Sequence, residues 1–390
     1  MVISSQGEAC SPNDDINALD LHGTNALRDR LLKIQANSAG GEEALLARAG
    51  IELEQEKQGE EAKIGQARQA LREFRDYLAQ SSDKAAQALP NEEELEYNYN
   101  PETQECEITR QDGEDIELDL GQSNLEGELP LPPQLMVAKL DCNHNQLTAL
   151  PMLPTSLTRL YCYSNQLTAL PELPDNLTRL DTRSNSLTVL PELPASLTEI
   201  DCGINHLIVL PELPDSLTKL DCGANKLTEL PELPANLYEL DCSSNQLTTL
   251  PELPVSLTVL YCNYNDLTVL PELPDSLTDL SCVSNQLTGL PELPASLTNL
   301  SCFNNQLTTL PVLLDSLTRL DCRDNQLTVL PELPASLTKL YCDSNKLTTL
   351  PELPASLTDL DCRHNPILDS DPAAQAALQS MSARGGTVWS

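Results

Sequence analysis

The chain has 390 residues and a formal net charge of −36, from 59 acidic and 23 basic residues. A nucleic-acid backbone is bound by clustered Lys and Arg, so this charge argues against a nucleic-acid partner and favours a basic or mixed-charge one. The sequence has no apolar run long enough to span a membrane and no basic-then-apolar start typical of a secretory signal. We therefore expect no membrane span and folding in a reducing cytoplasm, where the 13 cysteines stay unpaired.

The N-terminal third is predicted to be polar and then helical. Residues 1–22 are polar and indicate a disordered segment. Residues 23–90 predict a helical domain, with one helix over 26–37, a break at Gly40-Gly41 and a second helix over 42–56. A third helix is indicated by apolar residues at three-four spacing, which favour either a small helical bundle or a chaperone-binding stripe. These residues are Ile64, Ala67, Leu71, Phe74 and Leu78.

Residues 91–130 are predicted to form an acidic hairpin and a degenerate capping repeat. Asp112-Gly113 lies between two short runs of strand type, 106–109 and 116–120, which is typical of a hairpin turn. Leu118, Leu120 and Leu125 then repeat the leucine spacing of the segment that follows, so we expect them to cap its first turn.

Residues 131–370 consist of twelve units of 20 residues without insertion. The unit reads L-x-x-L-x-C-x-x-N-x-L-T-x-L-P-E-L-P, and its Asn recurs at 20-residue intervals from Asn145 to Asn365. Leu160 and Cys162 alternate with outward residues at a period of two, which predicts a strand. Stacked units then form a leucine-rich-repeat solenoid with a parallel sheet on its concave face. Two prolines in each Pro-Glu-Leu-Pro run favour an extended, polyproline-like convex side.

The Asn and Cys positions are predicted to stack in the solenoid. The Asn amide can bond backbone groups that the turn after the strand leaves unpaired. The cysteines share one inward position, which favours buried thiols that act as small apolar fillers, and Thr182 takes that place in one unit. At the end of the chain, residues 371–390 predict a helical cap. Asp371 caps a helix that begins at Pro372 and ends before Gly385-Gly386, and Val388 and Trp389 cover the last turn.

The repeat motif resembles the LPX-type leucine-rich repeats of bacterial type III secreted effectors of the YopM and IpaH kind, over residues 131–370. The resemblance implies an α+β horseshoe that binds a host protein, and a secretion signal within residues 1–22. The usual N-terminal tryptophans are missing, because the one Trp is Trp389. Only 25 residues follow Asn365, so we expect no C-terminal ubiquitin-ligase domain, and Cys322-Arg323-Asp324 matches its C-x-D motif by coincidence.

The strand residues that differ between units are the candidate partner-binding residues, because exposed aromatics and Arg dominate interfaces; neutral drift is the alternative. They form an early basic-aromatic group, a central apolar group and a late basic group. These residues are Tyr161, Tyr163, Arg179, Arg183, Ile204, Val259, Tyr261, Tyr264, Val283, Phe303, Arg323 and Tyr341.

Ionisable residues offer a further set of interpretations. Asp181, Asp201, Asp221 and Asp241 form an acidic column, which Arg179, Arg183 and Lys219 compensate or calcium bridges. The four histidines lie far apart in sequence and have no fixed nucleophile, so no cofactor, catalytic residue or metal ligand is assigned. The sequence thus favours a non-enzymatic interaction module, and a substrate-recognition part of a ubiquitin-ligase system is the alternative. The charge row of Glu172, Glu192 and their equivalents is read as a solubility device.

Overall fold

The computed structural model describes residues 42–366 and 372–389. The predicted segment 1–22, the helix over 26–37 and the cap residue Asp371 lie outside these residues. The chain divides into two compact units, residues 1–66 with 99–106, and residues 67–98 with 107–390. No helix among the described residues is long and apolar enough to cross a membrane.

A single helix, α3 (Glu42–Ser81), replaces the two helices predicted between residues 42 and 78. The helix continues through Gly50 and Gly59, because a glycine costs only about 1 kcal/mol in a segment otherwise rich in Glu, Gln, Lys and Ala. The predicted apolar stripe is confirmed from Ala67 to Leu78, where its residues are buried. A short helix, α4 (Asp83–Gln87), follows, and the Ser82 hydroxyl caps it by accepting from the amide of Ala85 at 3.0 Å.

The predicted hairpin at Asp112-Gly113 is wrong. A 3-10 turn, η1 (Glu92–Glu94), leads into β1 (Leu95–Asn100), which pairs instead with β2 (Glu105–Arg110). Gly113 does turn the chain, at φ +76°, but the next strand, β3 (Ile116–Asp119), joins the solenoid sheet beside β5 (Val137–Asp141). Leu118 and Leu120 are fully buried, so the capping leucines need the solenoid interior and direct β3 to that partner.

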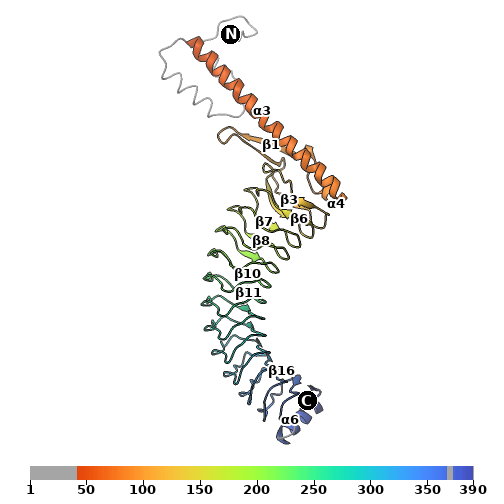
Figure 1. Ribbon diagram of the computed structural model, residues 1–390, viewed down its shortest axis with the longest axis vertical. Helices are drawn as coiled ribbons and strands as arrows, with labels where there is room; N and C mark the ends of the chain where they lie inside the picture. Colours follow the sequence, from red (N-terminus) through yellow and green to blue (C-terminus); the bar gives the residue numbers. More distant parts are fainter. Residues whose placement is uncertain (1–41, 367–371, 390) are drawn as a thin grey trace. The chain divides into compact units, whose positions relative to one another are not determined.

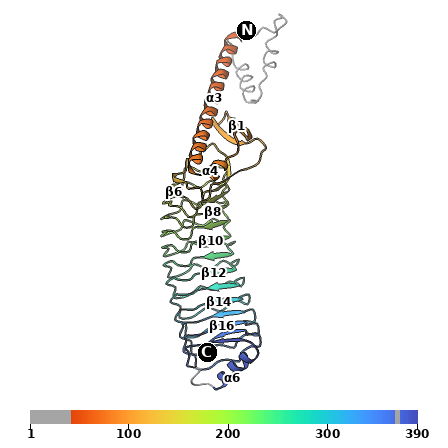
Figure 2. The ribbon, with the colours of Figure 1, turned by 90° about the vertical axis from the view of Figure 1, so that its right-hand side faces the viewer.

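The solenoid is built on one 14-stranded parallel sheet, whose strands follow one another in chain order (Figure 2). Figure 1 shows the same strands as successive turns of one coil. A separate pair of parallel strands, β4 (Glu126–Glu128) and β6 (Gln146–Ala149), lies in the first turns. After β3 the sheet contains β5 (Val137–Asp141), β7 (Arg159–Tyr161), β8 (Arg179–Asp181), β9 (Glu199–Asp201), β10 (Lys219–Asp221), β11 (Glu239–Asp241), β12 (Val259–Tyr261), β13 (Asp279–Ser281), β14 (Asn299–Ser301), β15 (Arg319–Asp321), β16 (Lys339–Tyr341), β17 (Asp359–Asp361) and β18 (Thr387–Trp389).

The core is a stack of leucines and cysteines, as the repeat predicts. Equivalent residues pair between neighbouring strands, for example Leu220 with Leu240, so each inward side chain packs on its copy one turn away. The cysteines of the ladder, from Cys142 to Cys362, are buried and form no disulfide. No helix interrupts residues 131–366, and the side of each turn opposite the sheet is extended or turned backbone.

The Asn ladder joins each turn to the one before it. The amide of Asn225 donates to the carbonyl oxygens of Cys222 and Cys202, at 3.1 and 3.0 Å, and its Oδ1 accepts from the amide of Leu207 at 3.0 Å. The residue before each ladder Asn has a positive φ, as in Ala224 at +53°. This left-handed residue turns the chain out of the strand and so aims the Asn side chain inward.

The predicted C-terminal helix is confirmed, but Trp389, which was expected to cover the last turn, is 40% exposed. Helix α6 (Pro372–Ala383) ends before Gly385, which has φ +88°, and β18 then pairs with β17. A Cβ on Gly386 would lie 2.8 Å from Cγ of Met381, so the chain passes tightly over the helix there. Val388 is opposite Leu360, which places it over the last inward leucine.

Candidate partner-binding face

We call the outward residues of the repeat strands and of the turns that follow them the sheet face. It has four columns of equivalent residues. In one repeat the first to fourth columns are represented by Lys219, Asp221, Gly223 and Ala224. The first two columns belong to the strands, the third follows one inward residue after the strand, such as Cys222, and the fourth contains the left-handed residues. All twelve predicted binding residues belong to these columns.

Both basic groups of the sheet face are neutralised within the protein. Arg183 donates to Asp181, with Nη2 to Oδ2 at 2.7 Å, and its Nε lies 2.9 Å from Oδ2 of Asp201. Arg323 forms the same pair with Asp321 at 2.7 Å. Residues two apart on a strand point to the same side, so the D-x-R spacing favours this pairing, and the predicted compensation of the acidic column by Arg183 is confirmed.

Arginine and aromatic side chains also stack along the sheet face. Arg183 lies 5.1 Å from the ring centre of Tyr163, and Arg323 lies 5.0 and 5.6 Å from the rings of Phe303 and Tyr341. These distances are typical of cation–π contacts, which hold the side chains in fixed positions. Lys139 similarly lies 6.0 Å from the ring of Tyr161. The flanking aromatic residues are thus brought together with cations and are only partly open to a partner.

The central group is more open. Ile204 and Tyr264 are each 58% exposed, and Tyr261 is 36% exposed. Val259 is half-buried in β12, whereas Val283 is buried and offers little surface. The exposed apolar residues of this central group therefore lie between the turn of β9 and the turn of β12.

The first-column charges beside this centre are paired with one another. Arg179 bonds Glu199 at 2.8 Å, and Lys219 bonds Glu239 at 2.7 Å. They are therefore not close partners of the acidic column, and Arg183 alone of the three predicted cations forms ion pairs with it among the described residues.

The acidic column has little compensation at its centre. Burial and the neighbouring Asp221 and Asp181 carboxylates raise the pKa of Asp201 to about 7, although Arg183 opposes the shift. Burial also raises the pKa of Asp221. In the described part of the chain, no group of three or more His, Cys, Asp or Glu side chains is arranged to hold a metal ion.

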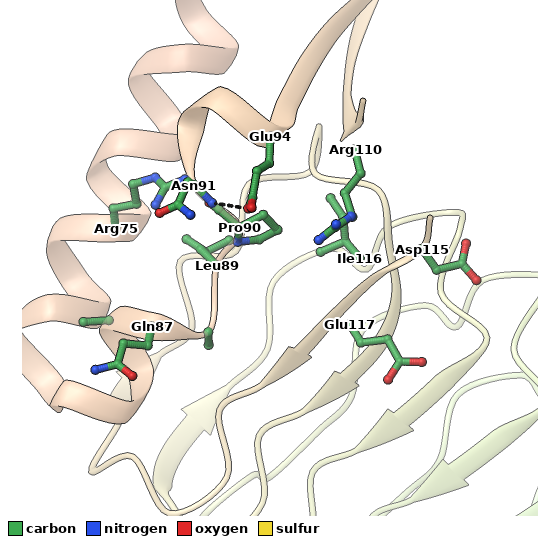
Figure 3. A pocket seen from close by; sticks show the side chains of 12 residues that line it. Arg75, Gln87, Leu89, Pro90, Asn91, Glu94, Arg110, Asp115, Ile116 and Glu117 are labelled. Atoms are coloured by element: carbon green, nitrogen blue, oxygen red, sulfur yellow. Dashed lines mark hydrogen bonds between the residues drawn. The ribbon is translucent and has the colours of Figure 1, made fainter. Parts of the chain in front are cut away.

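A separate hollow of about 520 Å³ lies between the end of α3 and β3 (Figure 3). Most of its charged residues already have partners. Arg75 donates to the carbonyl oxygen of Pro90, Arg110 pairs with Asp112, and the amide of Asn91 donates to Glu94 at 2.9 Å. The hollow therefore lacks a nucleophile paired with a base, and we assign it no chemistry.

Two solved structures of YopM proteins are similar to the repeats of this chain. YopM from Yersinia enterocolitica is 43% identical, with a TM-score of 0.62, over 64% of this chain and 56% of that one. YopM from Yersinia pestis, described as a leucine-rich effector protein, is 37% identical, with a TM-score of 0.51, over 65% of this chain and 84% of that one. This chain belongs to the YopM-like leucine-rich-repeat proteins.

A more distantly similar structure shares only the fold with this chain. The leucine-rich-repeat domain of APL1B is 23% identical, with a TM-score of 0.52, over 63% of this chain and 82% of that domain. A scan of described protein families and a search of curated proteins found no match. The YopM-like chain matches just over half of the Y. enterocolitica protein, so activities and partners of the whole relative are not carried over as findings.

Proposed function

We propose that this YopM-like protein is a non-enzymatic interaction module, a bacterial secreted effector that holds a host protein on its sheet face. The observation that supports this most directly is the uninterrupted sheet, whose inward residues are near-identical while its outward residues differ from turn to turn. Such a surface offers a long row of positions that can be varied without disturbing the core. The neighbours described as YopM and as a leucine-rich effector protein support the same role.

We also propose where the protein is made and where it acts. The protein is made in the bacterial cytoplasm, residues 1–22 act as its secretion signal with or without a chaperone, and it acts in the host cytoplasm. The second candidate function is substrate recognition within a ubiquitin-ligase effector system, which the resemblance to IpaH-kind repeats favours. A ubiquitination assay with the purified chain, E1 and E2 separates the two. Chain formation without an added ligase contradicts the non-enzymatic role, and its absence supports it.

Capture of a host protein tests the binding face. The double variant Tyr261→Ala, Tyr264→Ala removes exposed aromatic surface from the centre and should reduce capture from host lysate at least tenfold. The control Met152→Ala, Val255→Ala removes side chains that are 75% and 83% exposed on loops away from the sheet, and should capture normally. Mass spectrometry identifies the partner captured by the wild type. Equal capture of that partner by both folded variants would exclude the sheet face.

A further inference from the structure

Two exposed apolar residues on the sheet face are held on left-handed backbone. Ile204 has φ +53° and Tyr264 has φ +52°. A β-branched residue at such a φ is strained by about 1–3 kcal/mol, and at the same column other repeats use Ser, Ala, Asn, Asp or His. Because both side chains are 58% exposed, packing within the chain does not offset the strain. Strain kept at side chains that are mostly exposed points to contacts with another molecule.

Small residues occupy the space between these two side chains. In the fourth column Ala224 and Ser244 separate Ile204 from Tyr264, a distance of three strand spacings or about 14 Å. The adjoining third column has Gly203, Gly223 and Ser243, where other repeats place Arg, Phe, Tyr, Asn, Val or Asp. Neighbouring side chains of the fold therefore cover little of this stretch.

The second column beside the small residues is anionic. A Cβ on Gly223 would lie 3.3 Å from Oδ1 of Asp221 and 3.6 Å from Oδ1 of Asp241, so both carboxylates border the glycine. Each carboxylate accepts one backbone amide at 2.9 Å, from Gly223 and Ser243 respectively. Among the described residues, no Lys or Arg forms an ion pair with either of them, in contrast to Asp181 and Asp321. Half-buried carboxylates without a cation leave an unmet attraction for one.

We propose, building on the function above, that the sheet face from β9 to β12 binds an arginine-bearing extended segment of the partner protein. The guanidinium lies over Gly223 between Asp221 and Asp241, and the flanking residues of the segment contact Ile204 and Tyr264. Arginine fits better than lysine, because its planar fork bonds two carboxylates and also stacks on a tyrosine ring. Tyr261 of β12 lies opposite Asp241 of the neighbouring strand β11, and it supplies that ring.

The charge of the chain supports this occupant. At −36 it attracts a basic segment over long range, whereas two copies of the chain repel each other. Arg183 and Arg323, which a second copy offers from its own sheet face, are already paired with aspartates.

The test uses a labelled eight-residue peptide of alternating Gly and Arg, with fluorescence anisotropy near physiological salt. The variant Asp221→Asn, Asp241→Asn keeps the shape of both side chains and should raise the peptide Kd at least tenfold. The control Asp215→Asn, Asp275→Asn makes the same change in net charge on loops away from the sheet and should alter the Kd less than twofold. A peptide with citrulline in place of arginine should bind at least tenfold more weakly. Equal effects of the two variants, or equal binding of the citrulline peptide, would overturn the proposal.

Capture of the natural partner separates this inference from the proposed function. If Tyr261→Ala, Tyr264→Ala abolishes capture while Asp221→Asn, Asp241→Asn leaves it unchanged, the binding face stands and the arginine-bearing segment is wrong. If both variants reduce capture, both proposals are supported. If neither does, both fall.

Discussion

Removal of one rung of the Asn ladder is expected to destabilise the solenoid strongly. Asn245 donates to the carbonyl oxygens of Cys222 and Cys242, each at 3.1 Å, and accepts from the amide of Leu227 at 3.0 Å. Asn245→Ala leaves the buried amide of Leu227 without its partner, whereas the carbonyl oxygens of Cys222 and Cys242 lose one donor each and keep the amides of Asn225 and Asn265. One buried polar group left without a partner costs about 1–3 kcal/mol and each further lost hydrogen bond about 0.5–1.5 kcal/mol, so with some relaxation we predict a loss of about 2–4 kcal/mol.

Urea unfolding followed by circular dichroism measures this loss. Asn236→Ala is the matched control, because Asn236 is exposed and makes a single side-chain bond, to the carbonyl oxygen of Asp215 at 3.2 Å. We expect the control to lose less than about 1 kcal/mol. Comparable losses for the two variants, or a loss below about 1 kcal/mol for Asn245→Ala, would show that the ladder bonds do not couple the turns.

Three further predictions concern the charged column, the thiols and the strained backbone. Asp201→Asn should stabilise the protein by about 1–2 kcal/mol at pH 8 and not at pH 4. Because its pKa is raised, folded Asp201 holds a proton between about pH 4 and 7 that the unfolded chain releases, so the stability of the wild type falls across this window. Equal pH profiles of urea unfolding for the variant and the wild type would contradict this. Burial raises the pKa of the ladder thiols, to about 12 in Cys282 and about 11 in Cys362. A disulfide reagent at pH 8 should therefore modify the folded ladder at least a hundredfold more slowly than the unfolded chain, with Cys362 fastest, whereas rapid labelling of all the thiols would contradict this. Ile204→Asn relieves the left-handed strain and should raise stability by about 1 kcal/mol while it weakens capture of the partner; a destabilised variant would show that the exposed Ile204 is a packing residue.

The repeat could be read from the sequence because position and role coincide in it. Leu160 and Cys162 recur every 20 residues, so one register decides the inward side of the whole sheet, and the Asn position follows from the same register. The N-terminal elements lack this repetition. There, Asp112-Gly113 marked a real turn, but the partner of β3 was decided by distant leucines of the solenoid, which local turn chemistry does not contain.

The residues of the sheet face could be predicted from the sequence, but not which of their side chains are open to a partner. The sequence placed Arg183 and Arg323 on the sheet face, two residues after Asp181 and Asp321, but the stacking of these arginines on aromatic rings of neighbouring turns was not predicted. The strain at Ile204 was equally hidden, because its left-handed φ belongs to the turn and not to the residue type.

Glycines decide where the sheet face keeps free negative charge. In the turn of β8, Asp181 is followed two residues later by Arg183, which neutralises it, whereas in the turn of β10 the same position is Gly223 beside Asp221. Gly223→Arg should recreate the pair of the β8 turn, fill the space over Asp221 and raise the Kd of the Gly-Arg peptide at least tenfold. Gly223→Ala adds the Cβ alone and serves as its control, with a smaller effect expected. If Gly223→Arg folds normally and still binds the peptide as the wild type does, the carboxylates of β10 and β11 are not what attracts the basic segment.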